Sequence, residues 1–257
     1  MTNLPEEELY LYAVVLSGAA ASLGSLGPIG LFGQEVRPML VGRIAAVVSA
    51  VPDGTGKIRP ERRNLMAHQA VISRLTGREF GLLPVAFGTI SPGPTPLAAL
   101  LARYETDLLA QLKRVGAAVE MEVRAELNVP NVFEYFVNAR PELRAERDRV
   151  FGSGNAPSRD DKIALGQLFQ RILDEEREAM AERFIAALEP NASEIQRNDC
   201  RSEKELVRLS VLLSLSDQAR FDLAIDGLGR ELAEEHNIVV TGPFPAYSFV
   251  DVHLHSP

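Results

Sequence analysis

Hydrophobic and charged residues alternate over residues 119–127. Every second residue is apolar, and the residues between them are glutamate or arginine. This period of two predicts a β-strand with one buried face. A similar alternation over 207–215 predicts another strand, and the polar segment 194–200 predicts a short, weak strand before it.

Three largely apolar runs predict buried strands in the first hundred residues. They cover Leu9–Leu16, Val41–Val51 and Phe80–Phe87, and they are rich in the residues that favour strands. Between the first two, a Gly- and Ser-rich loop is expected from Ser17 to about Gly30. Near the other end of the chain, 237–241 and 247–252 are expected to be extended.

Apolar residues at helical spacing predict five helices. The first begins after Pro60 and is expected to end at Gly77, because glycine favours a helix stop. Pro141 must kink or interrupt the third helix. Ser158 and Asp161 have the spacing of a capping box at the start of the fourth helix, which is the longest. The five helices span residues 61–76, 97–115, 131–150, 158–188 and 216–232.

The order of these elements predicts an α+β protein of two domains. From Val119 onward the order is strand, helices, strand, strand, helix, strand, which is that of a ferredoxin-like unit. A helical hairpin over about 131–189 enlarges its first crossover. The earlier part has the order β-β-α-β-α and is expected to be a reduced ferredoxin-like unit. We therefore expect an N-terminal domain over 1–115 and a C-terminal domain over 116–257.

Composition and charge exclude several classes of protein. With 46% hydrophobic and 24% charged residues, the 257-residue chain can form a core and is not intrinsically disordered. Its net charge of −8 disfavours a nucleic-acid partner. The single cysteine, Cys200, cannot close an intrachain disulfide. Since there is also no signal peptide and no apolar run of roughly 20 residues, we expect a cytoplasmic protein without a membrane segment.

Candidate catalytic and ligand-binding motifs are weak. The glycines of Gly24–Gly30 have the spacing GxxGxxG, and Gly54–Ile58 lacks the Ser or Thr of a phosphate-binding loop, so both are interpreted as loops. His253 and His255 can share one face of a strand. Because Asp251 is the only further ligand nearby, a solvated tail is the better interpretation. We therefore expect no catalytic site, no metal and no cofactor.

The segment Gly242–Val250 contains three aromatic residues and two prolines. Prolines fix an extended backbone that does not suit a central strand, whereas aromatic side chains give large contact areas at low entropic cost. Two interpretations remain open, a rigid turn that pins the last strand to the core and a surface that binds a partner. In the second case, serine at the three aromatic positions should abolish binding and leave the fold intact. The candidate contact residues are Phe244, Pro245, Tyr247 and Phe249.

Three parts of the chain, in this order, resemble the gas vesicle protein F/L family. They are Leu9–Val14 (LYLYAV), Glu61–Ile72 (ERRNLMAHQAVI) followed by Leu82–Thr89 (LLPVAFGT), and Gly242–Val250 (GPFPAYSFV). The resemblance implies a modified ferredoxin-like N-terminal domain and a C-terminal α+β domain with long helices. It also implies a cytoplasmic accessory or minor structural protein of gas vesicles rather than an enzyme. The implied partners are the small, very hydrophobic shell subunit, GvpA, and other gas vesicle accessory proteins.

These implied partners suggest a physical role for the acidity of the chain. A subunit that forms a gas-tight wall must expose apolar surface before assembly, and such surfaces aggregate. An acidic partner that covers this surface would keep the complex in solution. We expect the contacts on the C-terminal aromatic segment and on the loop Leu23–Phe32. Arg62, Arg63 and His68 are expected to form either a polar anchor for the subunit or an interdomain salt bridge.

A rival function is a small-molecule-binding regulator or enzyme, because ferredoxin-like scaffolds support many activities. A deep pocket lined by groups of perturbed pKa would favour this function. A shallow apolar surface would favour the assembly role.

Overall fold

The computed structural model describes residues 7–52, 55, 57–76, 81–152, 156–232, 234 and 236–251. The chain divides into two compact units. Unit 1 comprises Met1–Glu120 together with Gly242–Pro257, and unit 2 comprises Met121–Thr241. Unit 2 is thus an insertion, entered through strand β6 (Ala118–Leu127) and left through strand β9 (His236–Phe244). This division differs from the expected one at 115 and 116, because the end of the chain belongs to unit 1.

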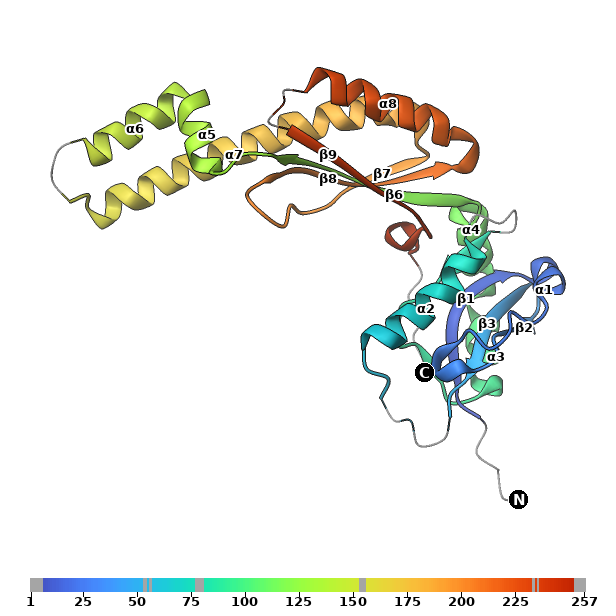
Figure 1. Cartoon of the computed structure of the whole chain (residues 1–257). Coiled ribbons are helices and arrows are strands. Elements are labelled where there is room, and N and C mark those ends of the chain that lie inside the picture. The colour runs from blue at the N-terminus through green and yellow to red at the C-terminus, as the bar shows by residue number, and fades with distance from the viewer. Residues whose placement is uncertain are drawn as a thin grey trace. The chain divides into compact units, whose positions relative to one another are not determined.

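Unit 1 is built on a five-stranded sheet (Figure 1). Four of its strands have the order β2-β3-β1-β4, and β5 also pairs with β1; every pairing is antiparallel. The order in which the third strand lies beside the first is that of a split β-α-β unit. The strands are β1 (Leu9–Leu16), β2 (Arg37–Val41), β3 (Ile44–Ala50), β4 (Leu82–Pro84) and β5 (Ile90–Ser91).

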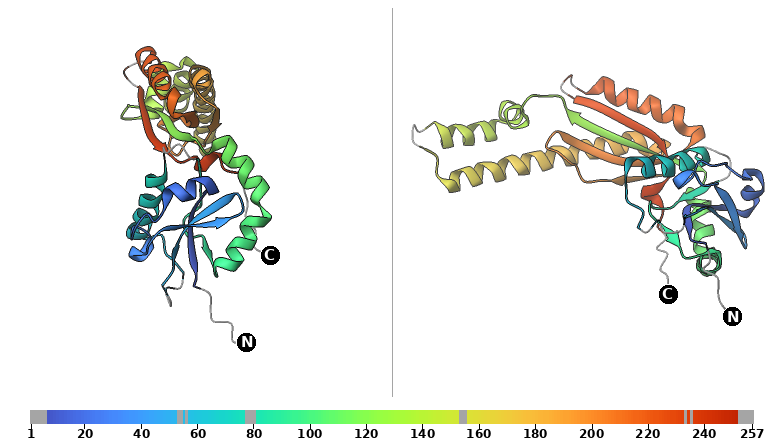
Figure 2. Two further views of the ribbon diagram at one scale, coloured as in Figure 1. Left: turned by 90° about the vertical axis from the view of Figure 1, so that its right-hand side faces the viewer. Right: turned by 60° about the horizontal axis from the view of Figure 1, so that its bottom comes forward.

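Helices cover both faces of this sheet. In the left view of Figure 2, α2 (Arg62–Leu75) and α4 (Glu105–Val115) lie on opposite sides of it. Two further helices, α1 (Ser17–Leu23) and α3 (Pro94–Arg103), complete the two layers. Because both faces are covered, β1 is buried at every position except Leu16. This explains why the strand is a continuous apolar run instead of an alternating one.

Unit 2 has a four-stranded sheet of order β7-β8-β6-β9, where β7 is Glu194–Arg197 and β8 is Glu205–Ser214. The predicted alternation along β6 is confirmed, since its apolar residues are buried. Two of the charged residues between them pair with the neighbouring strand. Arg124 lies 3.6 Å from Glu205, and Arg208 pairs with Glu122. These pairs connect charged side chains of β6 to β8 on the polar face of the sheet.

The helices of unit 2 are α5 (Val132–Ala139), α6 (Pro141–Phe151), α7 (Arg159–Leu188) and α8 (Gln218–Glu231). Pro141 begins α6, as expected of a residue that interrupts a helix but suits its first turn. The predicted cap of α7 is also confirmed, because the Asp161 N–H donates to Ser158 Oγ at 3.1 Å. α6 and α7 contact one another as the expected hairpin.

Two elements are not among those that the sequence predicts. α1 occupies Ser17–Leu23, where a loop is expected, and β2 pairs with β3 as an edge strand although it contains Pro38. With these two elements, unit 1 has the complete order β-α-β-β-α-β instead of the reduced one. Both were missed because α1 is only seven residues long and β2 is mostly part-exposed, so that neither has a strong period.

Several predicted boundaries are also corrected. The helix predicted over 97–115 is two helices, since the backbone leaves the helical conformation at Tyr104. The segment predicted to be extended from 247 contains a 3₁₀ turn, η4 (Tyr247–Phe249). Gly77, His253 and His255 lie outside the described residues, as do Gly54 and Gly56.

Two glycine substitutions test the packing of unit 1. A Cβ on Gly81 would lie 2.4 Å from the carbonyl carbon of Gly116, whereas a Cβ on Gly18 in α1 would meet nothing within 4 Å. We expect Gly81→Ala to lower the free energy of unfolding by about 1–3 kcal/mol through overpacking. Gly18→Ala, the matched control, should raise it by about 0.5 kcal/mol. Calorimetric unfolding measures both, and equal stability of the two variants would contradict this packing.

Candidate functional site

Five side chains of unit 1 form one aromatic cluster. They come from the three parts of the chain on which the family resemblance rests. The cluster consists of Tyr10 and Tyr12 from β1, His68 from α2, Phe87 after β4, and Tyr247 from η4. The Tyr10 and Tyr12 rings lie 4.8 Å apart, and the His68 ring stacks on Tyr12 at 5.7 Å. Residues distant in sequence therefore meet at a single place in the core of unit 1.

His68 connects the two ends of this cluster by hydrogen bonds. Its Nδ1 lies 2.9 Å from the Tyr10 hydroxyl, and its Nε2 lies 3.2 Å from the Tyr247 hydroxyl. The Gly88 N–H donates to the Tyr10 oxygen at 2.9 Å. The arrangement that satisfies every group has Tyr10 donating to Nδ1 and the proton of His68 on Nε2, donating to Tyr247. His68 is therefore a neutral bridge.

Tyr12 anchors a second loop to the same cluster. Its hydroxyl accepts a hydrogen bond from the Leu31 N–H at 2.8 Å and lies 2.9 Å from Ser49 Oγ on β3. Tyr12 is fully buried, so its polar tip needs these partners. The cluster thus holds the loops at Leu31 and Gly88 and the C-terminal segment at Tyr247.

Burial keeps every titratable group of the cluster uncharged. It raises the pKa of Tyr10 and of Tyr247 to about 12, and it raises the pKa of Tyr12 as well. It also lowers the pKa of His68 below its ordinary value. Both ring nitrogens of His68 face tyrosine hydroxyls, so the arrangement holds the cluster together and leaves neither nitrogen open to a substrate proton.

The C-terminal segment, Gly242–Asp251, is fixed on one side and presented on the other. Phe249 is 1% exposed, and its carbonyl oxygen accepts a hydrogen bond from Arg114. The Glu120 carboxylate accepts from the Ser248 N–H at 2.9 Å and from its hydroxyl at 2.6 Å. In contrast, Phe244 and Tyr247 are 38% and 39% exposed. Both interpretations of this segment therefore have a basis, on opposite sides of it.

The residues proposed from the sequence divide accordingly. Phe244 and Tyr247 present aromatic surface, whereas Pro245 and Phe249 are buried. Serine at Phe249 would consequently damage the core, contrary to the expectation that the triple replacement leaves the fold intact. His68 belongs to the aromatic cluster and not to a salt bridge. Arg62 and Arg63 are exposed at the start of α2, where Arg63 pairs with Glu61 at 3.1 Å.

Tyr10, Tyr12 and Phe87 are members of this cluster that were not predicted from the sequence. One signal was available for the tyrosines, because two hydroxyl groups within a fully apolar strand require buried partners. His68 is the one residue of α2 with a ring that can both donate and accept a hydrogen bond, so it could have been matched to these hydroxyls.

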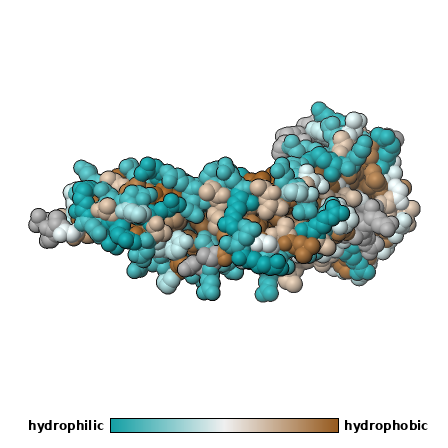
Figure 3. All heavy atoms as spheres, turned by 90° about the horizontal axis from the view of Figure 1, so that it is seen from above, coloured by the Kyte–Doolittle hydropathy of each residue, from teal (hydrophilic) through white to brown (hydrophobic). Residues whose placement is uncertain are grey.

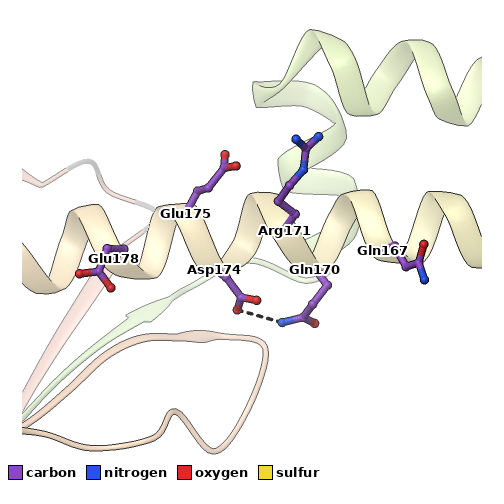
Figure 4. Close-up of a pocket in the computed structure, with 6 residues that line it drawn as sticks. All are labelled: Gln167, Gln170, Arg171, Asp174, Glu175 and Glu178. Atoms are coloured by element: carbon purple, nitrogen blue, oxygen red, sulfur yellow. Dashed lines mark hydrogen bonds between the residues drawn. The ribbon is translucent and has the colours of Figure 1, made fainter.

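Two hollows in unit 2 offer no comparable arrangement. One, of about 570 Å³, is lined only by α7 side chains that point in different directions (Figure 4). Gln170 and Asp174 form a hydrogen bond of 2.9 Å on one side of it. The other, of about 380 Å³, is lined by residues that include Arg177 and Cys200. Burial raises the pKa of Cys200, which leaves less of the nucleophilic thiolate.

The part of the chain that the structure describes contains neither a cluster of metal ligands nor a helix suited to crossing a membrane. There, no group of three or more His, Cys, Asp or Glu residues could hold a metal ion. No described helix is both long enough and apolar enough to cross a membrane.

Comparison with known proteins gave matches over almost the whole chain. Residues 8–251 match the family described as gas vesicle synthesis protein GvpL/GvpF. Gas vesicle protein F of Streptomyces sp. (strain CB03234) is 32% identical over 245 residues, which is 94% of this chain and 99% of that protein. Gas vesicle protein F of a Nostoc strain is 23% identical and covers 76% of this chain and 80% of that protein.

Two crystal structures have the same fold. The gas vesicle protein GvpF from Anabaena sp. PCC7120 matches with a TM-score of 0.82 at 22% identity, covering 96% of this chain and 100% of that chain. GvpF from Microcystis aeruginosa matches with a TM-score of 0.76 at 18% identity, covering 95% of this chain and 99% of that chain. These likenesses confirm the α+β fold predicted from the sequence.

The neutral state of His68 predicts a pH dependence of stability. Because its pKa is lowered on folding, the unfolded chain binds more protons as the pH falls through the ordinary histidine value of about 6.5. Stability is therefore fully present above that value and is lost below it. We expect the melting temperature to fall between pH 7.5 and pH 5.

The comparison variant is His68→Gln, which can accept from Tyr10 and donate to Tyr247 but does not titrate. It should be less stable at pH 7.5, since it lacks the stacked ring, and its melting temperature should change less with pH. Parallel pH profiles for the wild type and the variant would contradict the role given to His68.

Proposed function

Since the chain belongs to the GvpL/GvpF family of gas vesicle synthesis proteins, we propose that it binds the shell subunit, GvpA, and limits its aggregation during early vesicle assembly. Family membership carries this proposal, because it gives the chain an accessory role in gas vesicles. The physical requirement for such a role is a surface that an apolar subunit can cover, on a protein that itself stays dispersed. The chain meets the two parts of this requirement in different units.

Unit 1 supplies the contact surface of the proposal. Phe244 and Tyr247 expose aromatic area from a segment whose backbone is held by Glu120 and Arg114. His68 holds the Tyr247 hydroxyl. Rigid, half-exposed aromatic residues lose little entropy on binding and are enriched among the residues that dominate interfaces. The exposed parts of these two side chains are therefore the preferred contact.

The net charge of the protein lies entirely on unit 2. Unit 1 has 11 basic and 11 acidic residues, whereas unit 2 has 16 basic and 24 acidic residues, and thus the full charge of −8. A neutral unit can cover apolar surface without removing an excess of one charge from water. A charged unit that repels its copies opposes association of the complexes. The face of the molecule in Figure 3 is consistent with this role, because hydrophilic residues (teal) separate the hydrophobic ones (brown) into small areas.

The proposed action is to cover apolar surface and strand edges of the subunit until it joins the growing shell. Uncovered, such surfaces pair with one another and aggregate. The rival enzymatic function lacks a comparable basis. The two hollows in unit 2 contain divergent side chains or a protonated thiol, and the groups with large pKa shifts in unit 1 are engaged with one another in the core.

Removal of the two presented aromatic residues tests the contact. We expect Phe244→Ser combined with Tyr247→Ser to weaken co-purification with the shell subunit by about tenfold or more, as for interface aromatics that cost at least 1.4 kcal/mol when truncated. Light scattering reports aggregation of the subunit. With the variant present, it should rise as much as it does when the subunit is alone.

Two controls make the result specific. Leu223→Ser removes a side chain of unit 2 that is 68% exposed and should leave binding unchanged. Tyr247→Phe keeps the ring but loses the hydrogen bond to His68, so it separates contact area from anchoring. If the double variant is folded and still protects the subunit, the contact surface lies elsewhere.

A further inference from the structure

The turn Leu31–Gln34 in unit 1 has an unusual residue at its tip. Phe32 has φ 57° and ψ 20°, and Gly33 follows with φ 71°. The Gln34 N–H donates to the Leu31 carbonyl oxygen at 3.1 Å, which closes the turn. Two successive residues with positive φ and this hydrogen bond define a type I′ turn.

Phenylalanine does not suit this position. Type I′ turns favour Asn, Asp or Gly at both central positions, because a bulky side chain at positive φ is strained. Phe32 is the only non-glycine residue with positive φ among the described residues. Its burial does not explain the strain, since the side chain is 42% exposed, whereas the neighbouring Leu31 is 1% exposed.

The aromatic cluster fixes the position of this turn. The Leu31 N–H donates to Tyr12, and the Gly30 N–H donates to the Gln34 carbonyl oxygen at 3.0 Å. At the base of the loop, the Leu26 N–H donates to the Val36 carbonyl oxygen and the Val36 N–H to the Gly27 carbonyl oxygen. A rigid loop with an exposed ring at its tip is thus attached to the cluster that also holds Tyr247.

The surroundings of Phe32 specify the chemistry of a partner. No charged residue occurs from Leu9 through Gln34, so the strand, α1 and the turn that lead to Phe32 are uncharged. The turn itself offers no charged side chain for ion pairing, and the charged residue that follows it, the exposed Glu35, disfavours a nucleic acid. The turn suits an apolar surface, where a preorganised aromatic ring binds at low entropic cost.

We propose that Phe32 is a second contact residue for the apolar shell subunit, with its ring inserted into an apolar recess of that subunit. This inference rests on the proposed function and adds a specific residue to it. The strain at Phe32 persists because the ring is needed for binding. Strained backbone conformations commonly occur at residues that contact a ligand. Replacement of Phe32 by a residue without a ring that suits the turn should therefore weaken binding without lowering stability.

The decisive variant is Phe32→Asn. Asparagine suits the type I′ turn, so the variant should unfold at the same or a higher temperature than the wild type. It lacks the ring, so its co-purification with the shell subunit should fall about tenfold. Phe32→Tyr, the matched control, keeps both the ring and the strain and should bind within about twofold of the wild type.

The outcomes separate this inference from the proposed function. If the wild type does not bind the subunit, the proposed function fails, and this inference fails with it. If the wild type binds and the double variant at Phe244 and Tyr247 does not, while Phe32→Asn binds as the wild type, only the inference about Phe32 is overturned. A lower melting temperature of Phe32→Asn would also overturn it, because Phe32 would then be a structural residue.

Discussion

The hydrogen bonds of His68 are the interactions on which unit 1 depends. Through one ring they connect Tyr10, which lies 58 positions before His68, to Tyr247, which lies 179 positions after it. A neutral imidazole is suited to this place because one nitrogen accepts while the opposite one donates. If the ring were lost, Tyr10 would keep the Gly88 N–H but lose the acceptor of its own proton, at a cost of about 1–3 kcal/mol for a buried group. Tyr247 would lose the bond that positions its ring.

This bridge also explains why the chain returns to unit 1 after completing unit 2. A segment with two prolines and a glycine can make few backbone ladder bonds, and β9 ends at Phe244. Its position depends instead on side-chain contacts from three elements, with Glu120 on Ser248, Arg114 on Phe249 and His68 on Tyr247. The same contacts decide which aromatic residues are buried and which are presented.

The fold could be predicted where one periodic face is buried, and not elsewhere. The alternation along β6 and the apolar stripe of α7 are consequences of one-sided burial, which the sequence records directly. The N-cap of α7 is a local hydrogen bond, and the residue types at 158 and 161 record it. α1 and β2 have no such periodic pattern, because tertiary contacts select them. Tertiary contacts also select the break between the two helices that meet at Tyr104.

The same limit applies to the candidate site. Composition identifies Gly242–Val250 as unusual, but prolines remove the period that would separate Phe249 in the core from Phe244 at the surface. The strain at Phe32 is conformational and has no sign in the residue type alone.

The separation of charge between the units gives the net charge of −8 a physical meaning that the total does not have. Spread evenly, eight excess negative charges would lie partly around any surface that contacts an apolar partner, and their desolvation would oppose binding. Here the unit that presents Phe32, Phe244 and Tyr247 is neutral, and the excess lies on the inserted unit. Because charge repulsion between complexes acts over about 8–10 Å at physiological salt, a charged unit joined to the contact unit can act without touching the partner. In the role proposed for this protein, apolar contact and dispersal therefore do not compete for the same surface.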